Sequence, residues 1–98
     1  MRSLDVRIVG REKTAAACRK HPEWGASLRA WVRITEGAQW KHFADVRYSF
    51  SSASYVSPFV IFNIAHGKAR LLTVIDYEEQ LVAVDSILTH AEYDREGF

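Results

Sequence analysis

The sequence predicts a single α+β domain spanning residues 1–98, and three observations support this class. The helical patterns come first along the chain, and the strand-like runs follow them instead of alternating with them. Short polar or Gly-containing turns separate the three strand-like runs of the last third, as in an antiparallel meander. A chain of 98 residues is also the size of one ordinary domain. We therefore expect an N-terminal strand, two helices, a three-stranded antiparallel meander and a short C-terminal helix.

The first elements are a strand and a helix. Leu4, Val6 and Ile8 alternate with charged residues and are followed by Gly10, which is the pattern of a half-buried strand and its end. Residues 11–21 are rich in Ala and favour a helix.

A second helix is predicted between Pro22 and Gly37. Pro22 ends the first helix and also suits the first turn of the next one, and Gly37 is typical of a helix end. Arg29 and Arg33 lie four residues apart on one side of this helix. Its apolar face carries Leu28, Trp31, Val32 and Thr35.

The rest of the chain is predicted to form a connector, three strands and a final helix. The Ser-rich connector, residues 41–58, contains one short extended segment near Tyr55. Gly67 suits the first hairpin turn, because glycine adopts positive φ at little cost. Residues 90–96 are polar helix formers. The three strands are residues 59–64, 69–77 and 81–88.

Composition excludes several classes of protein. A chain with 48% hydrophobic and 26% charged residues is globular, not disordered. No apolar run reaches the length that spans a membrane, and the first ten residues lack a signal-peptide pattern. Cys18 is the one cysteine, so no internal disulfide can form, which fits a reducing compartment, the cytoplasm. We interpret Cys18 as a buried helical thiol and not as a nucleophile.

Charge is unevenly distributed between the two halves. Residues 1–47 hold ten Lys and Arg against five Asp and Glu, whereas residues 48–98 hold three against seven. A basic half suits a polyanionic partner, although a solvated helical face has the same composition. The cations that we expect to contact RNA or the ribosome are Arg29, Arg33, Lys41 and Arg47.

The pattern of proton carriers and cations is compatible with RNA cleavage. No metal-ligand, Walker or dinucleotide motif is present, so we expect neither a metal nor a cofactor. Lys68 and Arg70 flank the start of one strand, and His90 and Tyr93 follow the end of the next. Antiparallel neighbours bring these positions together. His can move a proton of the ribose 2′-hydroxyl or the leaving oxygen, while Arg and Lys stabilise the phosphorane. A capped surface helix beside strand-edge cations accounts for the same residues.

Six segments carry a family likeness: Trp31–Thr35, Trp40, Phe43–Val46, Phe62–Ile64, Lys68 with Arg70-Leu71, and Leu88–Asp94, which reads LTHAEYD. Together they resemble the HigB toxins, mRNA interferases of bacterial type II toxin–antitoxin systems within the RelE-like group. The resemblance implies a RelE-like fold, ribosome-associated mRNA cleavage, and a hetero-oligomer with a HigA-type antitoxin that carries a helix-turn-helix domain. It also implies that Lys68, Arg70, His90 and Tyr93 line the RNA site, where Tyr93 stacks on or orients a base.

Two positions depart from the family pattern, and a third is expected to be structural. The family turn after Phe-Asn-Ile usually reads Gly-Gly-Asn, whereas this chain has residues 65–67, Ala-His-Gly. The family strand before THAEYD usually carries Arg where this chain has Asp85. An anion there weakens phosphate binding unless it points to the opposite face, and it favours the alternative of an attenuated or non-catalytic antitoxin- or ribosome-binding module. Asn63 is expected to be buried, with its amide satisfying the turn backbone.

Overall fold

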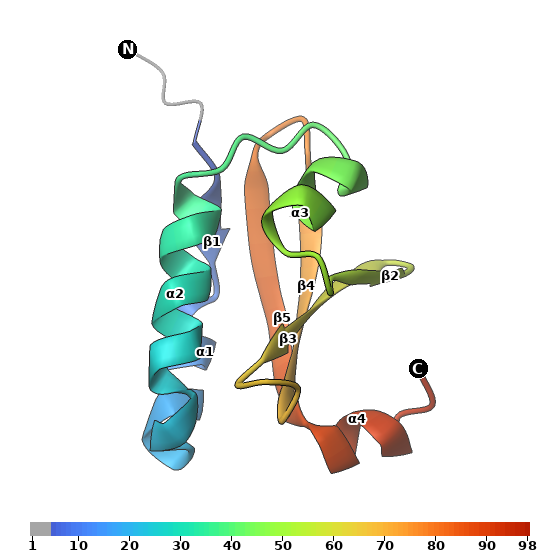
Figure 1. The fold of residues 1–98 in the computed structure, drawn as a ribbon. Coiled ribbons are helices and arrows are strands. Elements are labelled where there is room, and N and C mark those ends of the chain that lie inside the picture. Colours follow the sequence, from blue (N-terminus) through green and yellow to red (C-terminus); the bar gives the residue numbers. More distant parts are fainter. Residues whose placement is uncertain (1–4) are drawn as a thin grey trace.

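The structure, a computed structural model, describes residues 5–98. It contains one five-stranded mixed sheet in the order β1-β5-β4-β3-β2, with helices on both faces (Figure 1). β1 is parallel to β5, and the other neighbouring strands are antiparallel. This arrangement confirms the α+β class. The elements are β1 (Arg7–Val9), α1 (Arg11–Lys20), the 3-10 helix η1 (Pro22–Trp24), α2 (Gly25–Glu36), α3 (Phe43–Ser49), β2 (Ser54–Val56), β3 (Phe59–Ile64), β4 (Ala69–Asp76), β5 (Leu81–Thr89) and α4 (His90–Arg95).

Gly10 and Pro22 set the path of the first elements. Gly10 has a φ of 87°, and a Cβ there would lie 2.9 Å from the carbonyl oxygen of Val84 on β5, so glycine alone permits this close approach. Pro22 ends α1 and begins η1, as the sequence predicts. Val6 is buried, whereas Leu4 lies outside the described residues.

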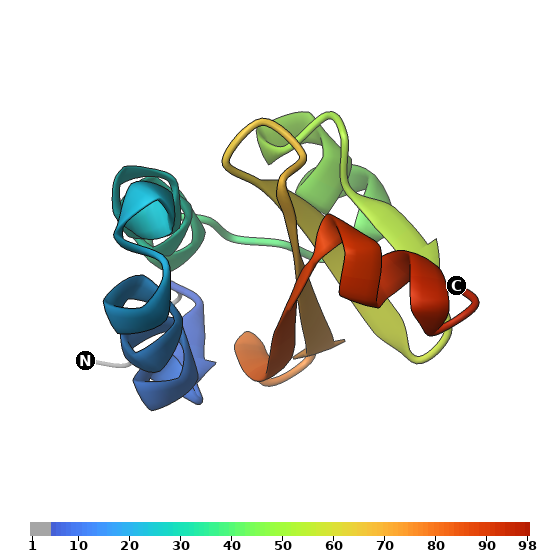
Figure 2. The same cartoon turned by 90° about the horizontal axis from the view of Figure 1, so that it is seen from below.

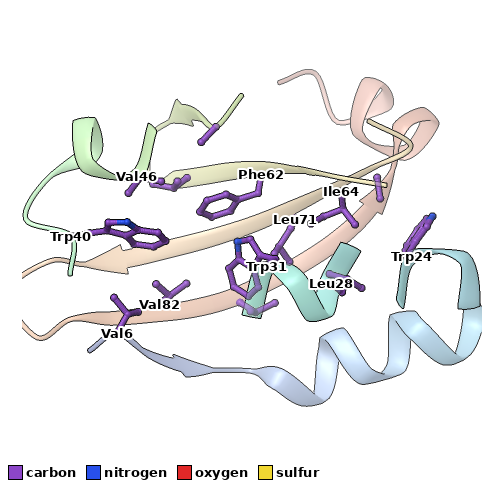
Figure 3. Packing of buried hydrophobic residues seen from close by; sticks show 14 residues of the cluster. Val6, Trp24, Leu28, Trp31, Trp40, Val46, Phe62, Ile64, Leu71 and Val82 are labelled. Carbon is purple, nitrogen blue, oxygen red and sulfur yellow. The ribbon is translucent and has the colours of Figure 1, made fainter. Parts of the chain in front are cut away.

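The hydrophobic core lies between the sheet and the helices on one of its faces (Figure 3). Leu28, Trp31 and Thr35 of α2 are buried, which confirms the predicted apolar face of this helix. The Trp31 ring meets Phe62 of β3 edge-on at 5.4 Å between centroids. Trp40 stacks on the same Phe62 ring at 6.3 Å. Each aromatic pair of this kind contributes roughly 0.5–1.5 kcal/mol beyond its buried area.

The connector contains more regular structure than the sequence predicts. The extended segment near Tyr55 is confirmed as β2, which pairs with β3 and makes the antiparallel meander four-stranded instead of three-stranded. The sequence analysis missed α3. This helix has seven residues, too few for independent stability. It is held by the fully buried Val46 and by a 3.1 Å hydrogen bond from Trp40 Nε1 to Ser49 Oγ.

The register of β3, β4 and β5 positions the candidate site. Arg70 of β4 lies between Asn63 of β3 and Leu88 of β5. α4 follows β5 directly and lies on the sheet face opposite α1 and α2 (Figure 2), where Tyr93 meets Arg70. None of the helices within the described residues has the length and apolar character needed to cross a bilayer.

Candidate active site at the junction of β4 and α4

Lys68 and His90 are joined through the backbone. The N–H of His90, the first residue of α4, donates to the carbonyl oxygen of Lys68 at 2.9 Å. Next to this bond, Ala69 of β4, which follows Lys68, lies opposite Thr89 of β5, which precedes His90. The antiparallel register therefore brings the β3–β4 turn and the start of α4 together, as the spacing of these residues in the sequence predicts.

The imidazole of His90 is held on one side and open on the other. Its Nδ1 lies 2.9 Å from Asp94 Oδ2, one helical turn further along α4, and the His90 side chain is 56% exposed. A carboxylate at Nδ1 orients the ring and leaves Nε2 free to exchange a proton with a ligand. A histidine held in this way has the geometry of a general acid or base.

Arg70 uses one guanidinium nitrogen to hold the β3–β4 turn. Its Nη1 donates to the carbonyl oxygens of Gly67 at 2.6 Å and Ala69 at 3.3 Å. The guanidinium carbon lies 5.4 Å from the centroid of the Tyr93 ring, within the range of a cation–π contact. Within residues 5–98, its remaining N–H groups have no hydrogen-bond partner. Arg70 can thus hold the turn and still bind an oxyanion.

Tyr93 belongs to an aromatic cluster between α4 and β3. Phe98 stacks on Tyr93 with ring centroids 5.0 Å apart and planes 8° apart. Phe98 also meets Phe59 of β3 edge-on at 5.9 Å. Phe98 and Arg70 therefore both lie against the Tyr93 ring.

A capping box fixes the start of α4. The Glu92 N–H donates to the Thr89 hydroxyl at 3.1 Å, and the Thr89 N–H donates to the Glu92 carboxylate at 2.8 Å. The pKa of Glu92 lies below its ordinary value. The hydrogen bond from the Thr89 backbone makes the largest contribution to this lowering, and the Thr89 side chain makes the next largest. Because the folded pKa is lowered, the stabilisation is present above the usual pKa of a glutamate and is lost as pH falls through the lowered value.

Asn63 corrects one expectation from the sequence. Its side chain is exposed, not buried, and it lies directly across from Arg70 in the β3–β4 register. It makes no side-chain hydrogen bond with any of residues 5–98. Asn63 therefore presents a free amide on the same sheet face as Arg70. The available signal was a polar residue at an alternating position of the otherwise apolar strand Phe59–Ile64, on the sheet face opposite Phe62 and Ile64.

The four cations expected to bind RNA do not form one surface. Arg29 and Arg33 are exposed on α2 and line a groove of about 650 Å³ against α1, which Glu12 and Glu36 line as well.

Lys41 and Arg47 lie instead around α3, which is separate from α2 (Figure 1). The backbone N–H of Lys41 donates to Asp45 Oδ2 at 2.8 Å, and Arg47 Nη2 donates to the Ser51 carbonyl oxygen at 2.9 Å. Residues 1–47 therefore present two separate cationic places in the fold. One is Arg29 with Arg33 on α2, and the other is Lys41 with Arg47 around α3.

Asp85 lies away from the cations that it was expected to oppose. In the β4–β5 register Leu72 pairs with Ser86 and Thr73 with Val84, so Asp85 occupies a β-bulge. Its carboxylate accepts a 2.9 Å hydrogen bond from Ser86 Oγ, and within the described residues it forms no ion pair with Arg70 or Lys68.

Two further points concern chemistry. The Cys18 thiol is free and half-buried rather than fully buried, and it lines the groove between α1 and α2. Within residues 5–98, no group of three His, Cys, Asp or Glu side chains is arranged to hold a metal ion.

Comparison with known proteins supports the same group that the sequence motifs resemble. No curated protein matched the chain. The family model for HigB toxins, described as the RelE-like toxic component of a toxin–antitoxin system, matches residues 25–96. The matched span runs from the start of α2 beyond the end of α4 and contains β2 to β5. The chain therefore belongs to the HigB toxin family, the RelE-like toxic components of toxin–antitoxin systems.

Proposed function

We propose that this toxin is a metal-independent endoribonuclease that cleaves mRNA on the ribosome. The observation that carries the proposal is the junction of Lys68 and His90, where a backbone hydrogen bond of 2.9 Å holds together the residue that carries a cation and the residue that carries an open imidazole. Arg70 adds unused guanidinium donors two residues away in the chain. One proton carrier and two cations at the same end of the sheet are the kinds of group that phosphodiester cleavage requires.

In the proposed mechanism the ribose 2′-hydroxyl oxygen attacks the adjacent phosphorus. The O2′–P bond forms while the P–O5′ bond breaks, which leaves a 2′,3′-cyclic phosphate and a 5′-hydroxyl. The proton leaves the 2′-hydroxyl, and another is delivered to the departing O5′. His90 Nε2 performs one of these transfers, worth roughly 10²–10⁴-fold in rate. Lys68 and Arg70 stabilise the negative charge that develops on the phosphorane oxygens.

Membership of a toxin–antitoxin system implies an antitoxin partner. We propose that this antitoxin is of the HigA type, carries a helix-turn-helix domain and forms a hetero-oligomer with the toxin. Ribosome binding would use one or both of the cationic places, Arg29 with Arg33 on α2 and Lys41 with Arg47 around α3. Each carries two exposed positive charges suited to RNA phosphates.

Controlled expression tests the function. Cells that produce the toxin without its antitoxin should stop growing, and primer extension should show discrete cuts within translated mRNAs. Co-expression of the antitoxin encoded beside the toxin should restore both growth and intact mRNA. Growth arrest with uncut mRNA would instead support a non-catalytic module that binds the ribosome.

A further inference from the structure

A pocket of about 480 Å³ adjoins the turn that carries Lys68. It is lined by Glu23, Ala26, Ser27, Ala65, His66 and Lys68. The pocket lies between the start of α2 and the β3–β4 turn, which are tied together by a 3.0 Å hydrogen bond from the Ala65 N–H to Ser27 Oγ. Its volume is within the range of sites that hold small organic groups. The pocket and the proposed cleavage site share Lys68.

The turn that forms one wall of this pocket is conformationally strained. Ala65 and His66 have φ values of 54° and 58°, in the left-handed region that residues with a Cβ rarely adopt. Gly67 follows with a φ of 85°, where no penalty arises. Strain of this kind in consecutive residues is concentrated at functional sites.

The His66 side chain does not contribute to the stability of the turn. It is exposed and makes no hydrogen bond, ion pair or ring contact with any of residues 5–98. Glycine would adopt the same backbone conformation with less strain. The imidazole is therefore a free group, held in the pocket wall at a cost to the fold.

We propose that this pocket binds the nucleobase next to the cleaved phosphodiester, which rests on the function proposed above. His66 would pack on the base, Ala26 and Ala65 would form its apolar walls, and Lys68 would hold the phosphate attached to the same nucleotide. Imidazole rings are among the groups on which unpaired RNA bases stack.

Glu23 gives the pocket a preference among bases. One of its carboxylate oxygens lies 3.3 Å from His21 Nδ1, and the other has no partner among the described residues. A carboxylate only accepts hydrogen bonds, so it favours cytosine, adenine or guanine, which carry an exocyclic amino group, over uracil, whose only base-edge donor is N3–H. The same negative charge makes the pocket unfavourable for an isolated phosphate.

The test compares cleavage maps of one translated mRNA for the native protein and four variants. His66→Gly and His66→Asn remove the imidazole from a position that both new residues tolerate at positive φ. Cleavage should slow by about tenfold or more, as when one base-stacking contact is lost, while the melting temperature does not fall. His42→Asn is the matched control, because it removes another exposed imidazole that lies beside α3 and outside the pocket, and it should cut at the native rate. Glu23→Gln should reduce the discrimination against uracil.

Two results would overturn the inference, and they are distinguishable. If the native protein cuts mRNA and both His66 variants cut at the same rate and positions, the pocket binds no base, although the nuclease function stands. If the native protein does not cut translated mRNA, the proposed function fails and the base pocket fails with it.

Discussion

His90 and Arg70 each use one nitrogen for the fold and leave others open. His90 Nδ1 lies against Asp94, and Arg70 Nη1 braces the turn at Gly67 and Ala69. This division fixes the position of both groups and leaves them able to bind a ligand, because each retains N–H or lone-pair positions with no hydrogen-bond partner among residues 5–98. A preorganised donor of this kind costs little reorganisation when charge develops on a substrate.

Replacement of His90 tests its role as proton carrier. His90→Ala should slow mRNA cleavage by roughly 10²-fold or more. Its free energy of unfolding should change by no more than about 0.5 kcal/mol, since the side chain is exposed and its ion pair lies on the surface.

His42 offers a matched control. It is 67% exposed and pairs with Asp45 at 3.7 Å beside α3, so His42→Ala removes a similar surface pair outside the candidate site. The two alanine variants should match in stability and differ in cleavage. Equal cleavage by both would remove His90 from the mechanism.

Asp85 is expected to have little influence on cleavage. Its position on β5 is three residues before Leu88, which lies opposite Arg70, so it is roughly 10 Å along the strand from that pairing. Arg70 also points toward the turn at Gly67, away from the bulge. At a separation near the Debye length, salt weakens the interaction between the exposed Asp85 carboxylate and the half-buried Arg70 guanidinium. Asp85→Asn and Asp85→Arg should therefore cut mRNA at close to the native rate. A clear gain in the Asp85→Arg variant would show that Asp85 attenuates the site.

At the scale of the elements, α4 depends on its cap. It has six residues, too few to form an independent helix, and within the described residues it buries no side chain fully. The capping box and the bond between His90 and Lys68 are what hold its first turn against the sheet.

Removal of the cap should affect stability and activity together. Thr89→Ala should lower the free energy of unfolding by about 1 kcal/mol. It should also speed hydrogen exchange at the first amides of α4, and it should slow cleavage because His90 is displaced. Thr89→Ser retains the hydroxyl acceptor and should behave as the native protein does. If the first amides of α4 exchange hydrogen in Thr89→Ala at the rate of the native protein, packing alone positions α4.

The sequence predicts the elements better than it predicts their contacts. Periodicity locates α2, β3, β4 and β5 closely, because each has an apolar face and a clear turn at its end. α3 gave no such signal, since seven residues are too few for a clear period, and this helix is held by packing around Val46 and Trp40. Likewise, Asp85 could be assigned to a strand, but the bulge that separates it from Arg70 depends on pairing with β4 and leaves no local pattern.

At the scale of the whole molecule, the fold splits the positive charge of the N-terminal half. Arg29 and Arg33 lie in a groove lined also by Glu12 and Glu36, where Arg11 pairs with Glu36 at 3.3 Å. The second pair of cations lies around α3. Net charge of a sequence segment therefore does not define one RNA-binding face, and each place has to be tested separately.

Salt dependence separates the two cationic places. We compare a variant with Arg29→Gln and Arg33→Gln and another with Lys41→Gln and Arg47→Gln for binding to ribosomes. Neutralising two phosphate contacts with single-stranded RNA should flatten the log–log salt slope by about 1.4. We expect this change in at least one variant. If both variants keep the slope of the native protein, the four cations form solvated surface only.

The chemistry of the cut ends tests the central claim most directly. Translated mRNA is incubated with purified toxin, and the new ends are assigned by their reactivity toward phosphatase, kinase and ligase. Attack by the ribose 2′-hydroxyl under proton transfer by His90 predicts a 2′,3′-cyclic phosphate, or its hydrolysed 2′- or 3′-phosphate, on one fragment and a 5′-hydroxyl on the other. Fragments with a 3′-hydroxyl and a 5′-phosphate, or mRNA that stays intact, would contradict the account.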